Sequence, residues 1–297
     1  MMKLWKNSKN GTEILGINER NMDFVYRQNS KENFKLADDK VRCKEILHNH
    51  GIACAETYGV IRRIGDISSV MAMLDHHEKL AIKPANGSGG GGILILKKDT
   101  RGKWTAGGKV KSEKEIFIHM AMIIMGKYSL GSSDHVLIEA VIEPHPFFAE
   151  IYPEGVPDFR VILLKNQPVM SMLRVPTDKS DGKANLHQGG LGIGIDTANG
   201  RLLKAFDGKS YFDHHPDIGN IIYGKKIPFW NDLIALAIRT SEVFPLNYLG
   251  IDIVIDKNLG PLIMEINVRP GLGIQLANRQ GLKESLMNIM QPKNNMQ

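Results

Sequence analysis

Cysteine and long apolar runs are scarce in this sequence. Cys43 and Cys54 are the two cysteines among 297 residues, which gives no disulfide framework and fits a reducing compartment. The opening MMKLWKNSKNGTE lacks the apolar segment of a secretory signal. No apolar stretch approaches the roughly 20 residues that a membrane helix needs. We therefore expect a cytoplasmic protein without a membrane segment.

The sequence also lacks a basic tail, an internal repeat and a low-complexity segment. The net charge is +6, but the basic residues are scattered and aromatic residues make up 7%. No basic patch interleaved with aromatic residues and no nucleic-acid recognition motif is present, so we expect no nucleic-acid partner. Apolar content of 42% and charged content of 24% are ordinary for a globular chain. The length allows one large or two modest domains.

The order of predicted elements is that of an α+β protein. Apolar spacing and capping residues predict four helices, which cover residues 38–51, 68–77, 112–126 and 228–244. The first is expected to begin at Asp38 or Asp39, and the second at Ser68 or Ser69. Strand patterns cover 56–63, 80–84, 93–99 and 135–143, with hairpins over 158–176 and 250–271. A Gly-rich loop is expected over 185–195. Hairpins in place of a regular βαβ alternation favour the α+β class.

A glycine-rich loop joins two of the predicted strands. The stretch 82–96 reads IKPANGSGGGGILIL, with Lys83 before the glycines and a strand after them. A P-loop and a dinucleotide-binding fingerprint both lead into a helix, so neither fits. A strand–glycine loop–strand unit is typical of a flap that closes over a nucleotide, although no HRD or DFG segment of a protein kinase is present. A surface hairpin without a ligand is the alternative reading.

The second signal is a pair of acid-bearing strands. Glu265 and Asn267 in MEINVRPG share one face of a strand, and Asp252 in GIDIVI can lie opposite Glu265 across the hairpin. Oxygen ligands without histidine or cysteine describe a site for a hard cation such as Mg²⁺, which a nucleotide would complete. Burying both carboxylates without a cation would be costly. The alternative is a solvated polar edge of the hairpin.

Basic residues lie in apolar strands between these two signals. Arg160 in DFR and Arg174 in MLRVP are flanked by Val, Ile, Leu and Met, and a guanidinium in such a place usually needs an anionic partner. The pairs His76–His77 and His214–His215 lack metal-binding spacing, so we expect them on exposed loops.

Taken in order, these segments resemble those of the ATP-grasp carboxylate–amine ligases. The similarity covers about residues 38 to 275 and is greatest for the alpha-L-glutamate ligase-like branch related to RimK. It is carried by DDKVRCKEIL, IKPANGSGGGGILIL, VLIEAVIE, DFRVILL, KANLHQGG, GIDIVI and MEINVRPG. The resemblance implies an ATP-grasp fold, in which two α+β subdomains grip ATP between them.

The resemblance also implies roles for individual residues. Lys83 would contact the α- and β-phosphates, and Lys40 would add a further nucleotide contact. The backbone of the hinge at Glu139, Ala140, Val141 and Ile142 would bind the adenine edge, with Glu139 or a nearby acid holding the ribose. Asp252, Glu265 and Asn267 would hold one or two Mg²⁺ ions, with Mn²⁺ as the alternative. The remaining nucleotide-site positions are Gly89, Gly90, Asp158, Lys183 and Asn185, and the catalytic positions are Arg160, Arg174 and Arg269.

Three departures from the RimK pattern are present, and two of them, at Arg269 and in the N-terminal region, concern the substrate. Arg269 stands where RimK has serine, and Lys183 stands where it has arginine. RimK-like enzymes also carry a full N-terminal domain, whereas here a short segment of residues 1–37 precedes the ATP-grasp domain expected over 38–290. Within that domain we expect a flap-bearing subdomain over about 60–138 and a metal-bearing subdomain over about 139–290.

The resemblance implies an ATP-dependent ligase that forms a C–N bond through an acyl phosphate. The expected partners are ATP, a carboxylate substrate and an amine acceptor, which can be an amino acid, a peptide or a protein tail. Glutamate as a substrate follows from the family resemblance alone. A homo-oligomer is one open possibility. The alternatives are a non-catalytic nucleotide-binding protein and an ATP-grasp phosphotransferase of the kinase type.

Overall fold

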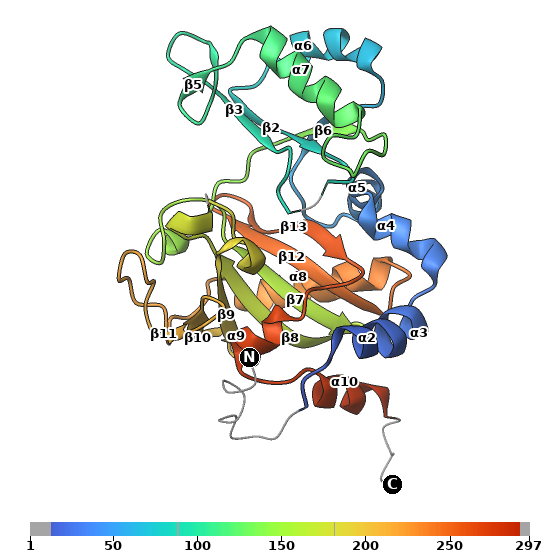
Figure 1. The fold of residues 1–297 in the computed structure, drawn as a ribbon, viewed down its shortest axis with the longest axis vertical. Coiled ribbons are helices and arrows are strands. Elements are labelled where there is room, and N and C mark those ends of the chain that lie inside the picture. The colour runs from blue at the N-terminus through green and yellow to red at the C-terminus, as the bar shows by residue number, and fades with distance from the viewer. Residues whose placement is uncertain (1–12, 88, 181, 292–297) are drawn as a thin grey trace. The chain divides into compact units, whose positions relative to one another are not determined.

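The chain forms two compact units. The computed structural model describes residues 13–87, 89–180 and 182–291 (Figure 1). Unit 1 contains residues 1–38, 46–53 and 143–297, and unit 2 contains residues 39–45 and 54–142. The first twelve residues of the predicted N-terminal segment lie outside the described part. Helix α5 (Lys40–Asn49) contributes residues to both units. It is capped by Asp39, whose carboxylate accepts from the N–H of Val41 at 2.9 Å, in agreement with the sequence prediction.

Unit 2 is built on a six-stranded antiparallel sheet. Its strands, in spatial order, are β1 (Thr57–Ile61), β6 (Val136–Glu139), β2 (Lys79–Pro84), β3 (Leu94–Lys98), β4 (Trp104–Ala106) and β5 (Lys109–Val110). The predicted flap is therefore a hairpin, because the glycine loop joins the paired strands β2 and β3.

Two helices cover one face of this sheet. Helices α6 (Ile67–Leu74) and α7 (Glu113–Ile124) lie on one face of the sheet (Figure 1). Their apolar side chains form one buried cluster with Leu80, Ile82 and Ile138. Because side chains alternate along a strand, Ala81, Lys83 and Glu139 are turned to the other face. A short 3₁₀ helix, η3 (Ile64–Asp66), leads into α6. Packing of the helices on one face thus leaves the lysine and the glutamate together on the opposite face.

Unit 1 is built on a seven-stranded antiparallel sheet. Its strands, in spatial order, are β11 (Tyr211–Phe212), β10 (Arg201–Phe206), β9 (Leu191–Asp196), β8 (Gln167–Val175), β7 (Asp158–Leu164), β12 (Tyr248–Asp256) and β13 (Gly260–Asn267). The two predicted hairpins are β7–β8 and β12–β13. Lys165 and Asn166, at the first turn, both have positive φ angles, as a two-residue hairpin turn requires.

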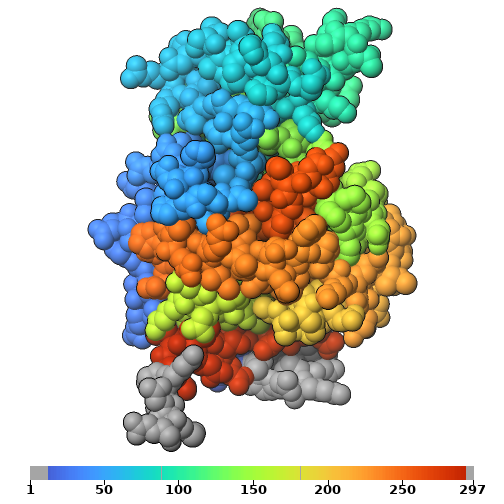
Figure 2. Space-filling view, turned by 180° about the vertical axis from the view of Figure 1, so that it is seen from behind, coloured from blue at the N-terminus to red at the C-terminus, as the bar shows by residue number. Residues whose placement is uncertain are grey.

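The long helix of unit 1 packs on its central strands. Helix α8 (Trp230–Val243) contacts β7, β8, β12 and β13 and buries Leu233, Leu236 and Ala237. Figure 2 shows the segment around α8, in orange, across the surface of this unit. Helices α9 (Gly273–Asn278) and α10 (Lys283–Met290) follow β13. The short 3₁₀ turns of this unit are η4 (Pro146–Phe148), η5 (Asp178–Ser180) and η6 (Leu186–Gln188).

The described chain before α5 is mostly helical from residue 17 to residue 38 and belongs to unit 1. It contains α2 (Ile17–Glu19), the π-helix η1 (Arg20–Val25), α3 (Tyr26–Gln28), the 3₁₀ helix η2 (Lys31–Asn33) and α4 (Phe34–Asp38). Asn29 fixes this segment to the sheet: its side chain donates to the carbonyl of Tyr248 at 2.7 Å and accepts from the N–H of Tyr248 at 2.9 Å. Within the described residues, no helix is long and apolar enough to cross a membrane.

Three local predictions were wrong. The expected Gly-rich loop contains strand β9. Helix α6 begins at Ile67, before Ser68 and Ser69, because Asp66 already has helical dihedral angles at the end of η3. His215 was expected on an exposed loop, but it is fully buried, and its Nε2 atom lies 3.0 Å from the carbonyl oxygen of Pro176.

Candidate active site

Four neighbouring strands of unit 1 bring the predicted acidic and basic residues to one face of the sheet. Asp252 on β12 lies opposite Arg160 on β7 and opposite Glu265 on β13. Asp158, two residues before Arg160, lies opposite Arg174 on β8 in the same way. Residues directly opposite each other in antiparallel strands have their side chains within contact distance. The register therefore assembles the site from residues 16 to 107 positions apart in the sequence.

The two arginines and two aspartates form one hydrogen-bonded network. Arg160 donates to both carboxylate oxygens of Asp252, at 2.8 and 2.6 Å. Arg174 donates to both oxygens of Asp158, at 2.5 and 2.6 Å, and also to Oδ2 of Asp252 at 2.8 Å. Paired bonds between a guanidinium and a carboxylate fix both position and orientation. The predicted need of each arginine for an anionic partner is confirmed.

The network is buried, so its charges attract one another more strongly than they would in water. Asp252 is 2% exposed and Arg174 is 7% exposed. Burial alone would raise the pKa of Asp252, but the charges of Arg160 and Arg174 outweigh it and lower that pKa. Burial opposes the charge of Arg174 as well, yet Asp158 and Asp252 raise its pKa. The Asp252 contribution to stability is thus present above the ordinary pKa of 3.8 and is lost as the pH falls through the lower folded value.

The cations that neutralise Asp252 are therefore arginines of the chain itself. This corrects one step of the sequence argument, because the burial of Asp252 does not require a metal ion and Glu265 is only partly buried. In the described part of the chain, no group of three or more His, Cys, Asp or Glu side chains is arranged to hold a metal. The predicted set is of another kind, with two carboxylates and an amide.

Glu265 and Asn267 fit a hard cation better than Asp252 does. Both lie at the partly exposed end of β13. The amide nitrogen of Asn267 donates to Oδ2 of Asp252 at 3.2 Å, which leaves the amide oxygen, the atom that binds cations, outside this bond. Asp252 accepts four hydrogen bonds, so ligation by Asp252 would require exchanging some of them. The ligand roles of these three residues stay predictions.

We expect the network to be essential for folding as well. Replacing Arg174 by methionine would leave the buried Asp158 without its main cation, which costs about 3–5 kcal/mol in comparable cases. Urea denaturation at pH 7 should show a loss of this size in the free energy of unfolding. Arg239→Met is the control, since Arg239 is exposed and makes a single long hydrogen bond of 3.4 Å to Gly51. A loss below 1 kcal/mol for Arg174→Met would contradict the assigned network.

In unit 2 the predicted phosphate-binding lysine contacts a buried glutamate. Lys83 on β2 forms an ion pair with Glu139 on β6, and Lys44 on α5 pairs with the second carboxylate oxygen at 2.6 Å. The side chain of Glu139 is 2% exposed. Burial would raise its pKa, but Lys83 and Lys44 hold that pKa below its ordinary value. One carboxylate faces two ammonium groups, so this cluster carries an excess positive charge.

The base of the glycine loop is held by its own unit. Nζ of Lys40 donates to the carbonyl of Gly87 at 2.7 Å. The buried carboxylate of Asp134 accepts from the backbone and side-chain nitrogens of Asn86, at 3.0 and 2.8 Å. Gly89 and Gly90 have φ angles of 62° and 75°, a region that favours glycine. Lys40 thus fixes the loop that the sequence predicts to cover a nucleotide.

The predicted adenine hinge follows directly after β6. The N–H of Ala140 donates to the carbonyl of Glu56 at 2.9 Å, so it is used within the unit. The backbone groups of Val141 and Ile142 are therefore the hinge groups that we expect to contact an adenine base. Because the carboxylate of Glu139 is engaged by two lysines, a ribose contact is better suited to a nearby acid, the other option in the prediction.

Three of the residues predicted in unit 1 have other surroundings than the arginine–aspartate network. Asn185 caps η6 by accepting from the N–H of His187 at 3.1 Å, and Lys183 is exposed in the preceding turn. Arg269 stacks on the rings of Phe34 and Tyr26, at 4.8 and 5.8 Å from their centroids. Among the described residues, the structure records no hydrogen bond or ion pair from Lys183, Asn185 or Arg269 to the network.

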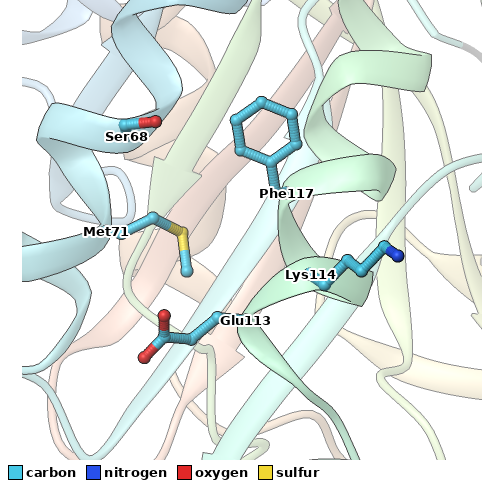
Figure 3. Close-up of a pocket in the computed structure, with 5 residues that line it drawn as sticks. All are labelled: Ser68, Met71, Glu113, Lys114 and Phe117. Atoms are coloured by element: carbon cyan, nitrogen blue, oxygen red, sulfur yellow. The ribbon is translucent and has the colours of Figure 1, made fainter.

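A surface hollow of about 310 Å³ lies elsewhere in unit 2. It is lined by Ser68 and Met71 of α6 and by Glu113, Lys114 and Phe117 of α7 (Figure 3). These residues belong to the helical layer, on the opposite face of the sheet from Lys83 and Glu139. The hollow is therefore separate from the residues that the sequence singles out.

Sequence reasoning missed two residues that organise unit 2. Lys44 is four positions after Lys40 and so lies on the same side of α5, a spacing that would have indicated a second lysine at the site. Asp134 carried no comparable signal, because it belongs to none of the segments singled out in the sequence and lies 48 positions from its partner Asn86.

Comparison with solved structures agrees with this architecture. Phosphoribosylamine–glycine ligase from Thermotoga maritima matches with a TM-score of 0.53 at 16% identity, over 97% of this chain and 63% of its own. Biotin carboxylase from Campylobacter jejuni matches at 0.51 and 13%, over 88% and 46%, and D-alanine–D-alanine ligase from Bacillus anthracis at 0.50 and 14%, over 88% and 69%. The chain also spans 60% of the ATP-grasp ligase PsnB. At these identities the likeness establishes the fold alone.

The family follows from the sequence itself. No curated protein is significantly similar to the chain. The model of one family, described as sugar-transfer associated ATP-grasp, matches residues 19–291 and so covers both sheets. The predicted ATP-grasp fold is confirmed, and the chain belongs to the sugar-transfer associated ATP-grasp family.

Proposed function

We propose that this protein is an ATP-dependent ligase that joins a carboxylate to an amine through an acyl phosphate. The observation that carries the proposal is the face of the unit 1 sheet on which Arg160 and Arg174 are locked by aspartates next to Glu265 and Asn267. Fixed guanidinium groups stabilise developing negative charge without having to reorganise during the reaction. Transfer of a phosphoryl group depends mainly on such positioning and charge neutralisation.

The lysine cluster of unit 2 supports the same reaction. Lys83 and Lys44 surround one carboxylate, that of Glu139, and their excess positive charge suits the phosphates of ATP. Lys40 holds the base of the glycine loop, whose backbone N–H groups can turn toward an anion. The hinge groups at Val141 and Ile142 are the proposed adenine contacts.

Two bond exchanges make up the proposed reaction. A carboxylate oxygen of the substrate attacks the γ-phosphorus of ATP, and the bond from that phosphorus to the β–γ bridging oxygen breaks to release ADP. The amine nitrogen then attacks the acyl carbon, the acyl C–O bond breaks, and inorganic phosphate leaves as the amine loses a proton. Closure of the glycine loop would exclude water, which protects the acyl phosphate from hydrolysis.

The chain's own residues have distinct parts in this scheme. Arg160 and Arg174 offset charge on the transferring phosphoryl group, while Asp158 and Asp252 hold them in place. Glu265 and Asn267, with Asp252 as a third candidate, would hold Mg²⁺ or Mn²⁺. Such a cation, when bound, neutralises phosphate charge.

The substrates are proposed by chemical class and not as individual compounds. The resemblance to RimK-like enzymes favours glutamate or another amino acid as one substrate, and a peptide or protein tail as a possible acceptor. The family description associates these proteins with sugar transfer, so amino sugars belong in any screen. A cytoplasmic location and assembly into a homo-oligomer are parts of the proposal that await direct measurement.

An isotope experiment tests the reaction class. The purified protein is incubated with Mg²⁺, ATP and a panel of ¹⁸O-labelled carboxylates, together with amines. Formation of ADP, an amide and ¹⁸O-labelled phosphate is the expected result, because the carboxylate oxygen leaves with the phosphoryl group. A stable phosphorylated product without an amide would indicate a phosphotransferase instead. Binding of ATP without ADP release across the whole panel would indicate a non-catalytic nucleotide-binding protein.

A further inference from the structure

The N-terminal helical segment contacts the turn that follows the predicted metal-binding strand. Arg20, the first residue of the π-helix η1, donates from Nη1 to the carbonyl of Pro270 at 2.7 Å. Its other nitrogens bond the side chain of Asn21, at 3.0 and 2.8 Å. A π-helix is rare and frequently occurs at functional sites. Arg20 is 8% exposed, so this contact is built into the fold.

A second arginine, Arg269, lies in the turn itself, and aromatic rings of the N-terminal helical segment orient it. The guanidinium of Arg269 lies 4.8 Å from the centroid of Phe34 and 5.8 Å from that of Tyr26. Val268 and Pro270 are buried, whereas Asn267 and Arg269 are not. Arg269 is thus exposed, two positions after Asn267, the predicted cation ligand. Aromatic stacking restrains the arginine while leaving its hydrogen-bond donors available.

These two arginines lack the carboxylate partners that Arg160 and Arg174 have. Among the residues that the structure describes, no carboxylate lies within ion-pair distance of Arg20 or Arg269. The acids of the N-terminal segment are engaged elsewhere: Glu19 pairs with Lys283 at 3.0 Å, and Asp23 with Arg27 at 3.8 Å. By contrast, Arg160 and Arg174 are fully paired with aspartates. Arg269 in the turn and Arg20 in the helix that contacts it therefore carry two positive charges, with no carboxylate partner among the described residues.

The positive charges of Arg20 and Arg269 repel each other. Burial lowers the pKa of Arg20, and the charge of Arg269 lowers it further, although Tyr248 counteracts this. The hydroxyl of Tyr248 is buried and has no hydrogen-bond partner among the described residues. Holding like charges together next to an unsatisfied polar group costs free energy. A bound anion would offset that cost.

The same turn contacts the arginine–aspartate network. A Cβ atom on Gly271 would lie 3.7 Å from Nη1 of Arg160, and one on Gly250 would lie 2.5 Å from Cβ of Pro270. The glycines thus let the turn approach the strand that carries Asp252. Arg160 uses Nε and Nη2 for Asp252, and its Nη1 faces the turn. A molecule bound at Arg269 would be placed beside the proposed phosphoryl-transfer groups.

We propose that Arg269 binds a carboxylate or phosphate group on the amine substrate, and that Arg20, Phe34 and Tyr26 position it. This inference rests on the proposed ligase function and adds the class of acceptor. A simple amine enters as a cation, which two arginines repel, whereas an acceptor with its own anionic group is attracted. The bound guanidinium charge also lowers the pKa of the nearby ammonium group, which favours the nucleophilic free amine. The N-terminal segment thereby supplies the acceptor contacts.

The test uses matched amines in the presence of Mg²⁺ and ATP. Glycine is compared with glycinamide, and glucosamine 6-phosphate with glucosamine, against the carboxylate panel described above. In at least one pair, we expect kcat/KM for the anionic member to be at least about tenfold higher than for its partner without the anionic group. One charge-assisted hydrogen bond contributes a free energy of that size. Preference within the first pair indicates a carboxylate subsite, and preference within the second indicates a phosphate subsite.

Variants connect this preference to the arginine. Arg269→Gln should remove the preference mainly by raising the acceptor KM, and Arg269→Lys should restore part of it. Arg20→Met, a change at a positioning residue, should raise the acceptor KM without changing the KM for ATP. Arg27→Gln is the matched control, because Arg27 lies in the same segment and is exposed. Equal use of both members of each pair, or an unchanged preference in Arg269→Gln, would overturn the proposal.

A binding measurement separates this proposal from the ligase proposal. Protein saturated with Mg²⁺ and ADP is titrated with glucosamine 6-phosphate, followed by ³¹P NMR, and with ¹³C-carboxyl glycine, followed by ¹³C NMR. Binding that is lost in Arg269→Gln supports the subsite even if no amide forms, in which case the proposed reaction alone is wrong. If neither probe binds in a way that depends on Arg269, and amides still form, the subsite is wrong and the ligase function stands.

Discussion

Replacing Glu265 by alanine should reduce ADP release at least about a thousandfold, a loss typical for removing a group that stabilises charge in the transition state. Glu265 lies opposite Asp252 at the partly exposed end of β13. With Asp252 held by two arginines, Glu265 is the carboxylate best placed to hold the cation that accompanies ATP. Steady-state ADP release with the substrate pair found in the isotope screen measures the loss.

The comparison needs a folded variant. Because Glu265 is not part of the buried core, the thermal transition of Glu265→Ala should stay within a few degrees of that of the wild type. Glu242→Ala, an exposed change on α8, serves as the matched carboxylate control and should keep full turnover. Glu265→Ala with wild-type turnover would remove this residue from the site. Raising the Mg²⁺ concentration should recover part of the activity of a weaker change such as Glu265→Gln.

Lys83→Ala is expected to have the second large effect, a loss of about 10²–10³-fold in kcat/KM for ATP. Lys83 is one of two ammonium groups around Glu139. Without Lys83, the buried glutamate keeps Lys44 as its partner, so the unit should stay folded. The excess positive charge disappears, however, and with it the attraction for the phosphates. The ATP dependence of ADP release measures this effect.

Two further variants make the result specific. Lys103→Ala removes an exposed lysine from the same unit and should leave kcat/KM unchanged. Glu139→Gln keeps the shape of the cluster but removes its negative charge, so Lys83 repels Lys44. We expect this variant to lose stability, unlike Lys83→Ala. A Lys83→Ala protein that binds and turns over ATP as the wild type does would contradict the assignment of Lys83 to the phosphates.

The hairpins could be predicted from the sequence because alternating apolar residues and turn residues are local signals, whereas the β-bulges that shift the register within each hairpin could not. Alternating apolar residues define β7 and β8, and Lys165–Asn166 between them permits only a tight turn. Strand β9 could not be predicted in this way, because glycine is rare in strands. Its glycines have a tertiary cause: a Cβ on Gly194 would lie 2.6 Å from the carbonyl oxygen of Ala277 on α9.

The part of the candidate site that could be predicted is the pair of residues that face each other across one hairpin. Asp252 and Glu265 were expected to face each other, and they do. The sequence also indicated that Arg160 and Arg174 need anions, but it did not show that Asp158 and Asp252 are those anions. That pairing depends on the order of β8, β7 and β12 in the sheet. The role of Arg20 was hidden for the same reason, since its partner Pro270 is 250 positions away.

The hydrogen bonds between Asn29 and Tyr248 have a consequence for how the chain folds during synthesis. Asn29 bonds the backbone of Tyr248, 219 positions later, and Leu15 bonds the side chain of Gln275, 260 positions later. The strands of the other sheet all lie between residues 57 and 139, so that unit can fold while the rest is still being made. The first helices emerge from the ribosome early, but their binding surface is synthesised near the end. The helices within residues 17–38 are therefore expected to dock on their sheet only after the later-made strands of the other unit have folded.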